Sequence, residues 1–260
     1  MVGLSVQARI VSAARGARWL AEGWQLFRVA PLAWLALACV YLLGTNILAL
    51  VPLVGLVAAL VIVPPLTVGM MSAARAATHG ATPQLRMLAE GFGPGVRTQL
   101  VLGAGYFACS MLVFFAMALA DPDGKLRGAL GGRAPQAELA LGEVVWPLAV
   151  FALAYAPVLM LFWFAPPLAA WHGSAAPKAL FYSFFACLMN WRAFLAYGAT
   201  VAVVMMALPL ATLALLRAFG AADVGMTVAS LVFPLLLVML PTLFASFYVS
   251  YRDVFGADKP

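Results

Sequence analysis

Six long apolar segments dominate the pattern of hydrophobic and polar positions along this chain of 260 residues. None of them contains a charged residue, and they cover residues 31–51, 53–71, 99–120, 145–170, 193–216 and 224–248. Because about 20 apolar residues in a helix cross the hydrocarbon core of a bilayer, each segment predicts a transmembrane helix. The pattern therefore predicts an all-α, polytopic membrane protein whose six transmembrane helices pair as three hairpins.

Three shorter segments, residues 7–29, 83–93 and 177–191, precede the first, third and fifth of these spans. In the first, apolar positions recur every three or four residues, and charged residues such as Arg15 and Glu22 occupy much of the remainder. A helix of this kind lies in the membrane interface with its apolar face in lipid. We therefore expect amphipathic interfacial helices at these three places.

The same segments suggest an internal repeat. Residues 20–24 read LAEGW, residues 88–92 read LAEGF and residues 180–184 read LFYSF. The second, fourth and sixth spans, which we call the returning spans, share a Pro-Pro-Leu or Pro-Thr-Leu motif at residues 64–66, 166–168 and 241–243. One interpretation is a three-fold repeat of an amphipathic helix followed by a hairpin. The other is that small, aromatic and basic residues recur by chance at membrane interfaces.

The composition fits a membrane protein, since 65% of the residues are hydrophobic and 9% are charged. With six spans, eleven of the 15 Lys and Arg residues fall on the side that holds both termini. The acidic residues divide almost evenly between the two sides, so the bias is the positive-inside pattern. We expect both termini in the cytoplasm and residues 121–143 as a periplasmic loop. Topology thus accounts for the net charge of +6 without a nucleic-acid partner.

A search for catalytic or metal-binding patterns finds none. No HExxH, GxSxG or phosphate-binding glycine-rich motif is present. The three cysteines lie in or beside apolar segments, and the two histidines, His79 and His172, each precede a glycine that would cap a helix. The spans hold no Asp, Glu, Lys, Arg or His, although proton-coupled carriers usually need such a group within the membrane. We expect no catalytic residue, no cofactor and no metal. An intramembrane enzyme is the least favoured of three functions, because the sequence offers neither a nucleophile–base pair nor a metal-ligand set.

Prolines concentrate on the returning spans, and the kinks that they predict have two possible roles. Pro64, Pro65, Pro166, Pro167 and Pro241 are among them. A proline kinks a helix and frees a carbonyl. Kinked spans could splay into a vestibule for a solute, or they could merely steer each span into the next interfacial helix.

Charged and polar residues on the expected cytoplasmic side form the best candidate site, which we call the rim cluster. Its members are Glu22, Arg28, Glu90, Arg97, Asn190, Trp191, Arg192, Arg252 and Asp253. Carboxylates near lipid headgroups are costly unless they are paired, so we expect Glu–Arg contacts between the repeated units. The cluster can be structural, or it can bind a ligand.

Three stretches of the chain resemble a known family. They are GWQLFR at residues 23–28 followed by PLAWL at 31–35, FAPPL at 164–168 with SFFACLMNW at 183–191, and YVSYRDVF at 248–255. They resemble an uncharacterised family of six-span inner-membrane proteins, chiefly from betaproteobacteria. The resemblance covers nearly the whole chain and implies residence in the bacterial inner (plasma) membrane. It implies no substrate, reaction or catalytic residue.

Taken together, these features favour a non-enzymatic membrane component that binds membrane lipids, another membrane protein or a second copy of itself. The alternative is a small channel or carrier for a neutral or amphiphilic solute. A carrier of that kind would contain a continuous cavity lined by polar span residues such as Asn46, Thr67, Ser110 or Thr200.

Overall fold

A computed structural model describes residues 7–52, 54–124, 141–218 and 224–256. Within these ranges all regular secondary structure is helical. The elements are α1 Ala13–Val29, α2 Pro31–Ala49, α3 Gly55–Val61, α4 Val63–Thr78, the 3-10 helix η1 Leu85–Phe92, α5 Val96–Ala120, α7 Leu141–Phe162, α8 Ala165–His172, α9 Ala176–Met189, α10 Trp191–Ala218 and α11 Val224–Phe255. The predicted all-α class is therefore confirmed, whereas most of the expected loop 121–143 lies outside the described residues.

Five helices of the described chain are long and apolar enough to cross a membrane, and a bent pair brings the number to six. The bent pair is α3 with α4, which meet at an angle of 40° inside the expected span 53–71. The expected span 145–170 is also interrupted, because α7 ends at Phe162 and α8 begins at Ala165. The last span is longer than expected, since α11 continues past residue 248 to Phe255.

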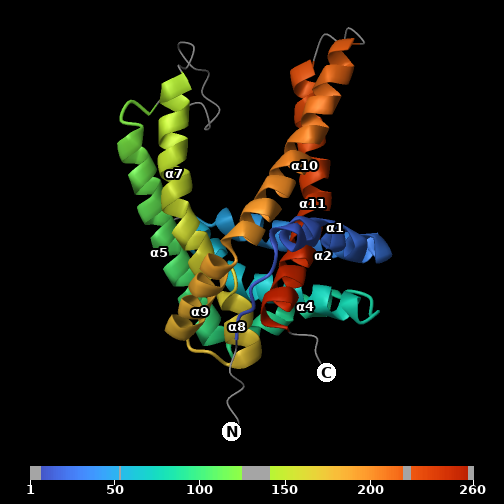
Figure 1. The fold of residues 1–260 in the computed structure, drawn as a ribbon, viewed down its shortest axis with the longest axis vertical. Helices are drawn as coiled ribbons and strands as arrows, with labels where there is room; N and C mark the ends of the chain where they lie inside the picture. Colours follow the sequence, from blue (N-terminus) through green and yellow to red (C-terminus); the bar gives the residue numbers. More distant parts are fainter. Residues whose placement is uncertain (1–6, 53, 125–140, 219–223, 257–260) are drawn as a thin grey trace.

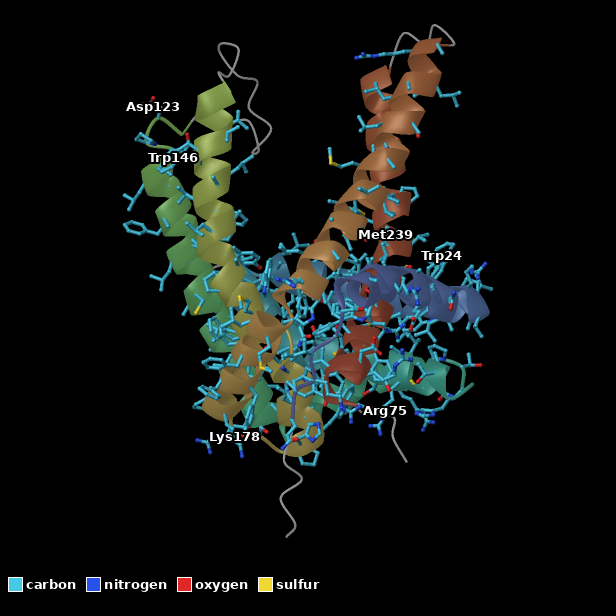
Figure 2. The ribbon with its side chains drawn as sticks, in the orientation of Figure 1. Trp24, Arg75, Asp123, Trp146, Lys178 and Met239 are labelled. Carbon is cyan, nitrogen blue, oxygen red and sulfur yellow. The ribbon has the colours of Figure 1, made fainter. Side chains whose placement is uncertain are left out.

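The helices form two tall hairpins above a broad layer of shorter helices (Figure 1). The hairpins are α5 with α7 and α10 with α11, and the layer, which we call the base, contains α1, α4, α8 and α9 together with the C-terminal end of α11. Lys178 and Arg75 lie at the base, whereas Asp123 and Trp146 lie at the far end of the α5–α7 hairpin (Figure 2). The two described ends of the chain meet, because the Arg9 N–H donates to the Val254 carbonyl at 2.8 Å.

The expected interfacial segments are helical with shifted ends. Residues 7–12 precede α1, which starts after Ser12 because the Ser12 hydroxyl accepts a hydrogen bond from the Arg15 N–H. The segment 83–93 forms a 3-10 helix rather than an α-helix, in a short stretch between Pro83 and the glycines that follow Phe92. The segment 177–191 is α9, which ends at Met189.

Small residues let these helices approach the returning spans closely. A Cβ at Gly23 of α1 would lie 2.6 Å from the Thr242 carbonyl oxygen of α11, and a Cβ at Gly91 of η1 would overlap the Pro65 carbonyl of α4. In α9 the equivalent residue is Ser183, which is fully buried. The three small residues therefore lie against three different places: Gly23 against α11, Gly91 against α4, and Ser183 against the junction of α7 and α8.

The prolines act at the interruptions. Pro64 and Pro65 stand in the first turn of α4, and Pro166 and Pro167 in the first turn of α8, where a missing N–H does no harm. The Ser183 hydroxyl satisfies the broken backbone between α7 and α8, since it accepts from the Phe164 N–H at 2.8 Å and donates to the Met160 carbonyl at 2.7 Å. By contrast, α11 runs through Pro234 and Pro241 as one helix.

The predicted glycine caps after the two histidines are confirmed. Gly80 follows His79 with φ +78°, and Gly173 follows His172 with φ +60°. Both values lie in the left-handed region that glycine adopts without strain.

Candidate functional site

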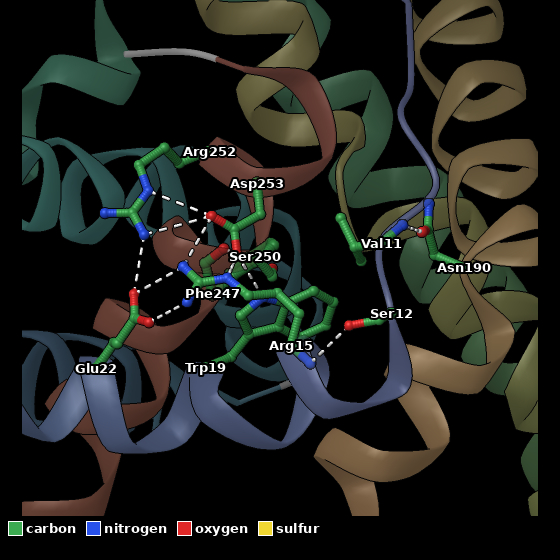
Figure 3. A network of polar contacts seen from close by, with 10 residues as sticks. All are labelled: Val11, Ser12, Arg15, Trp19, Glu22, Asn190, Phe247, Ser250, Arg252 and Asp253. Carbon is green, nitrogen blue, oxygen red and sulfur yellow. Dashed lines mark hydrogen bonds and ion pairs between the residues drawn. The ribbon is translucent and has the colours of Figure 1, made fainter. Parts of the chain in front are cut away.

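A ring of alternating charges joins the first and last helices at the base (Figure 3). Arg15 of α1 pairs with Glu22 of the same helix and with Asp253 of α11, its Nε lying 2.5 Å from Asp253 Oδ2. Arg252 closes the ring, since its Nη2 lies 2.9 Å from Glu22 Oε2 and 3.3 Å from Asp253 Oδ1. We call these four residues the ion-pair ring.

The side chains of the ion-pair ring are partly shielded from solvent, so their electrostatic contacts are screened less than those of fully exposed ion pairs. The Asp253 side chain is 11% exposed, and it also accepts a hydrogen bond from Trp19 Nε1 at 2.9 Å. The hydrogen bond to Asp253 is the main reason that the pKa of Arg15 is raised above its ordinary value, against the opposing effect of burial. Two arginines and two carboxylates thus neutralise one another, and the ring fastens α1 to α11.

Asn190, the cap between α9 and α10, makes a second polar contact at the base. Its Oδ1 accepts from the Val11 N–H at 2.7 Å, and its Nδ2 donates to the Arg9 carbonyl at 2.9 Å. Nδ2 also reaches the Ala186 carbonyl at 2.9 Å. The buried side chain of Asn190 therefore fixes both the α9–α10 corner and the segment that leads into α1.

The structure brings together only part of the rim cluster. Glu22, Arg252 and Asp253 meet in the ion-pair ring, but their central partner is Arg15, which sequence reasoning placed on α1 without assigning it a role. The sequence places Arg15 seven residues before Glu22, which is two helical turns, so the two side chains could have been predicted to share one face of the helix.

One Glu–Arg contact of the expected kind forms, between Glu22 of α1 and Arg252 of α11, but among the described residues the other Glu and Arg members of the rim cluster do not pair. Arg28, Glu90 and Arg97 are exposed, and no ion pair within the described residues includes any of them. The reason is that α1 crosses α11 at Glu22, so the partner of Glu22 comes from the last helix rather than from an equivalent position. Trp191 and Arg192 instead stack on each other, with the guanidinium 5.3 Å from the ring centroid.

A large apolar groove, which the sequence did not predict, lies between the two tall hairpins. Its volume is about 660 Å³, and it is lined from α7, α9, α10 and α11 by residues that include Leu159, Trp191, Leu195, Val201 and Phe244. The polar groups in its inner wall bond to neighbours: the Tyr197 and Ser246 hydroxyls lie 2.7 Å apart, and Trp163 Nε1 lies 3.5 Å from Ser250 Oγ. The groove therefore presents mainly carbon, and α7 and α10 diverge above it (Figure 1).

A second pocket of about 150 Å³ shares Leu159, Trp163 and Phe247 with the apolar groove. Thr67 and Tyr106 also line this second pocket. Two of the polar span residues expected to line a channel bond to their own helices instead, Asn46 to the Leu42 carbonyl and Thr200 to the Ala196 carbonyl.

Within the described part of the chain, no three His, Cys, Asp or Glu side chains form a group that could hold a metal ion. The arrangement offers charge pairing at the base and an apolar groove above it. Neither the ring nor the groove contains a nucleophile paired with a base.

Apolar helices of membrane-spanning length, standing on a base of shorter helices, define the class as α-helical integral membrane proteins. The chain is 36% identical over 258 residues to a protein of Burkholderia thailandensis that is named a probable inner membrane protein. The similarity covers 96% of this chain and 94% of that protein. The chain therefore belongs to the family of that inner membrane protein, and it is an integral protein of the inner membrane. No protein-family model and no solved structure matches the chain.

Proposed function

We propose that this protein is a non-enzymatic component of the inner membrane that binds a phospholipid in the apolar groove. The observation that carries the proposal is the groove itself, about 660 Å³ of space lined almost wholly by carbon between helices that face lipid. Ligand sites commonly have volumes of 300–1,000 Å³. Hydrocarbon is the solvent at this depth of a bilayer, so an acyl chain is the occupant that such walls favour.

The proposed topology has six spans, with α3 and α4 together forming one of them and both termini in the cytoplasm. The excess of Lys and Arg on the base side supports it, since the positive-inside bias sets orientation. Arg9 and Val254, near the two ends, share a hydrogen bond, which supports a topology with both ends on the same side of the membrane.

We also propose that the three units form a closed pseudo-threefold ring. Gly23 of the first unit packs on Thr242 of the third, Gly91 of the second on Pro65 of the first, and Ser183 of the third on Phe164 of the second. The amphipathic helix of each unit thus contacts the returning span of the unit before it, and the first unit contacts the third. In this arrangement the ion-pair ring fastens the first unit to the last.

Two glycines allow a matched test of lipid binding. Gly198 lines the groove and Gly44 lies on the exposed face of α2, and a Cβ at either would meet no atom within 4 Å. Gly198→Leu should therefore fill the groove without strain, and Gly44→Leu adds the same side chain elsewhere. Native mass spectrometry of protein extracted in mild detergent should find bound phospholipid in the wild type and in Gly44→Leu, and a several-fold loss in Gly198→Leu.

Wild-type protein without bound lipid, or equal lipid in both variants, would contradict the proposal. A bound mass of protein size that disappears in Gly198→Leu would instead identify the occupant as a helix of another membrane protein or of a second copy. Equal melting temperatures for the two variants would show that any difference in binding is not a folding defect.

The second pocket favours one other function, a carrier for an amphiphilic solute. Trp163 stands at the interruption between α7 and α8 and forms part of the wall between the groove and this pocket. Trp163→Ala would join the two spaces, so a carrier should show altered flux of an amphiphile in liposomes. Flux equal to that of protein-free liposomes would remove this function.

A further inference from the structure

We infer that the bound lipid is an anionic phospholipid of the cytoplasmic leaflet, with its headgroup held at Trp191 and Arg192. This inference rests on the proposed function, because it assigns the lipid class and orientation within the same groove. Two features carry it: the depth of the groove and the charge at its mouth.

The groove is as deep as one leaflet. Along α10 its lining runs from Trp191, at the start of the helix, to Val201. At a rise of 1.5 Å per residue this stretch is about 15 Å long. The hydrocarbon core of a bilayer is about 30 Å thick, so the groove spans about half of it. One acyl chain of the leaflet on the base side therefore fits along its length.

The mouth of the groove has the side chains of a membrane interface. Trp191 both lines the groove and is 51% exposed, which is the usual place of an interfacial tryptophan. The Arg192 guanidinium lies over the Trp191 ring at 5.3 Å, a cation–π contact that holds it beside the opening. Asn190 fixes the corner from which both residues project.

The local charge favours an anionic headgroup. No acidic residue occurs in the sequence between Glu143 and Asp223, so α8, α9 and α10 contain no carboxylate. Arg192 is exposed, and none of the ion pairs within the described residues includes it. Guanidinium binds phosphate oxygens in a planar, two-pronged geometry. An anionic lipid retains its net charge near this cation, whereas the choline of a zwitterionic lipid cancels it.

The test compares phosphatidylglycerol with phosphatidylcholine of the same acyl chains, supplied in equal amounts to detergent-purified protein. Native mass spectrometry should find about a fivefold preference of the wild type for phosphatidylglycerol, which is the ratio expected for one basic residue near an anionic headgroup. Arg192→Gln should reduce the preference to about one while lipid remains bound. Arg97→Gln is the matched control, because Arg97 is also exposed and unpaired but belongs to α5, which contributes no residue to the groove lining.

The outcomes separate the two proposals. Lipid bound without preference in the wild type, or an equal loss of preference in Arg97→Gln, would overturn the anionic-lipid inference and leave the groove as a general lipid site. Absence of any lipid would overturn the proposed function itself. Melting curves of both variants should match the wild type, since both side chains are exposed.

Discussion

The α10–α11 hairpin meets α1 through small and charged residues, whereas it faces α7 across large apolar side chains. Where α1 crosses α10 and α11, glycines bring backbones together, and a Cβ at Gly16 would overlap the Ala193 carbonyl. The ion-pair ring then fastens the same crossing. Where α7 faces α10, large residues such as Leu159 and Phe194 line an open groove.

The difference shows what decides whether two helices of a membrane protein pack closely or leave a groove between them. Apolar side chains gain little by leaving lipid for one another, so membrane helices associate mainly through close packing and polar contacts. The α1 crossing has both, and it is closed. The α7–α10 junction has bulky apolar walls whose polar groups are already bonded to neighbours, and it stays open to hydrocarbon.

The largest loss of stability should come from placing a large side chain at Gly16, where α1 packs on α10. Gly16→Leu places a side chain against the Ala193 backbone, which cannot move without shifting α10, so we expect a loss of about 3 kcal/mol in unfolding free energy. Gly44→Leu, at a site with open space, should cause no loss. Unfolding in detergent, followed by tryptophan fluorescence, measures both. Equal stability of the two variants would mean that α1 does not pack on α10.

A smaller loss should follow from breaking the ion-pair ring. Asp253→Ala removes the acceptor of Arg15 and of Trp19 Nε1, which should cost about 2 kcal/mol. Glu90→Ala removes a carboxylate that is exposed and unpaired, and should change stability by less than about 0.5 kcal/mol. The same unfolding assay compares them. If Glu90→Ala were as destabilising as Asp253→Ala, the ring would not be the fastening point.

The smallest effect in this series should be that of Ser183→Ala. The Ser183 hydroxyl bridges the Phe164 N–H and the Met160 carbonyl at the α7–α8 interruption, so its removal should cost about 1 kcal/mol. Thr200→Val is the control, because the Thr200 hydroxyl bonds only a carbonyl of its own helix. A loss for the control as large as that for Ser183→Ala would contradict the bridging role.

The sequence predicted the helical class, the positions of the apolar helices and the glycine caps, because these depend on local composition and spacing. It also predicted that Pro64, Pro65, Pro166 and Pro167 kink the returning spans, and the structure shows a full interruption of the helix just before each pair. It did not predict that α11 passes through Pro241 unbroken, since this depends on what surrounds the freed carbonyl.

The candidate site was predicted only in part, for a geometric reason. Glu22, Arg252 and Asp253 were singled out, but pairing them correctly required the crossing of α1 over α11, which no local pattern encodes. The groove was missed altogether. Its walls, such as Leu195 and Val201, are indistinguishable in sequence from ordinary lipid-facing residues, and only the divergence of α7 from α10 makes them a site.

The central claim is that phospholipid, rather than protein, fills the space between the α5–α7 and α10–α11 hairpins. An electron cryomicroscopy structure of the protein in phosphatidylglycerol nanodiscs tests it most directly. We predict elongated acyl-chain density between Leu159 and Val201, ending in headgroup density beside Arg192. Side chains of α7 and α10 packed directly against each other, with no lipid between them, would contradict the account.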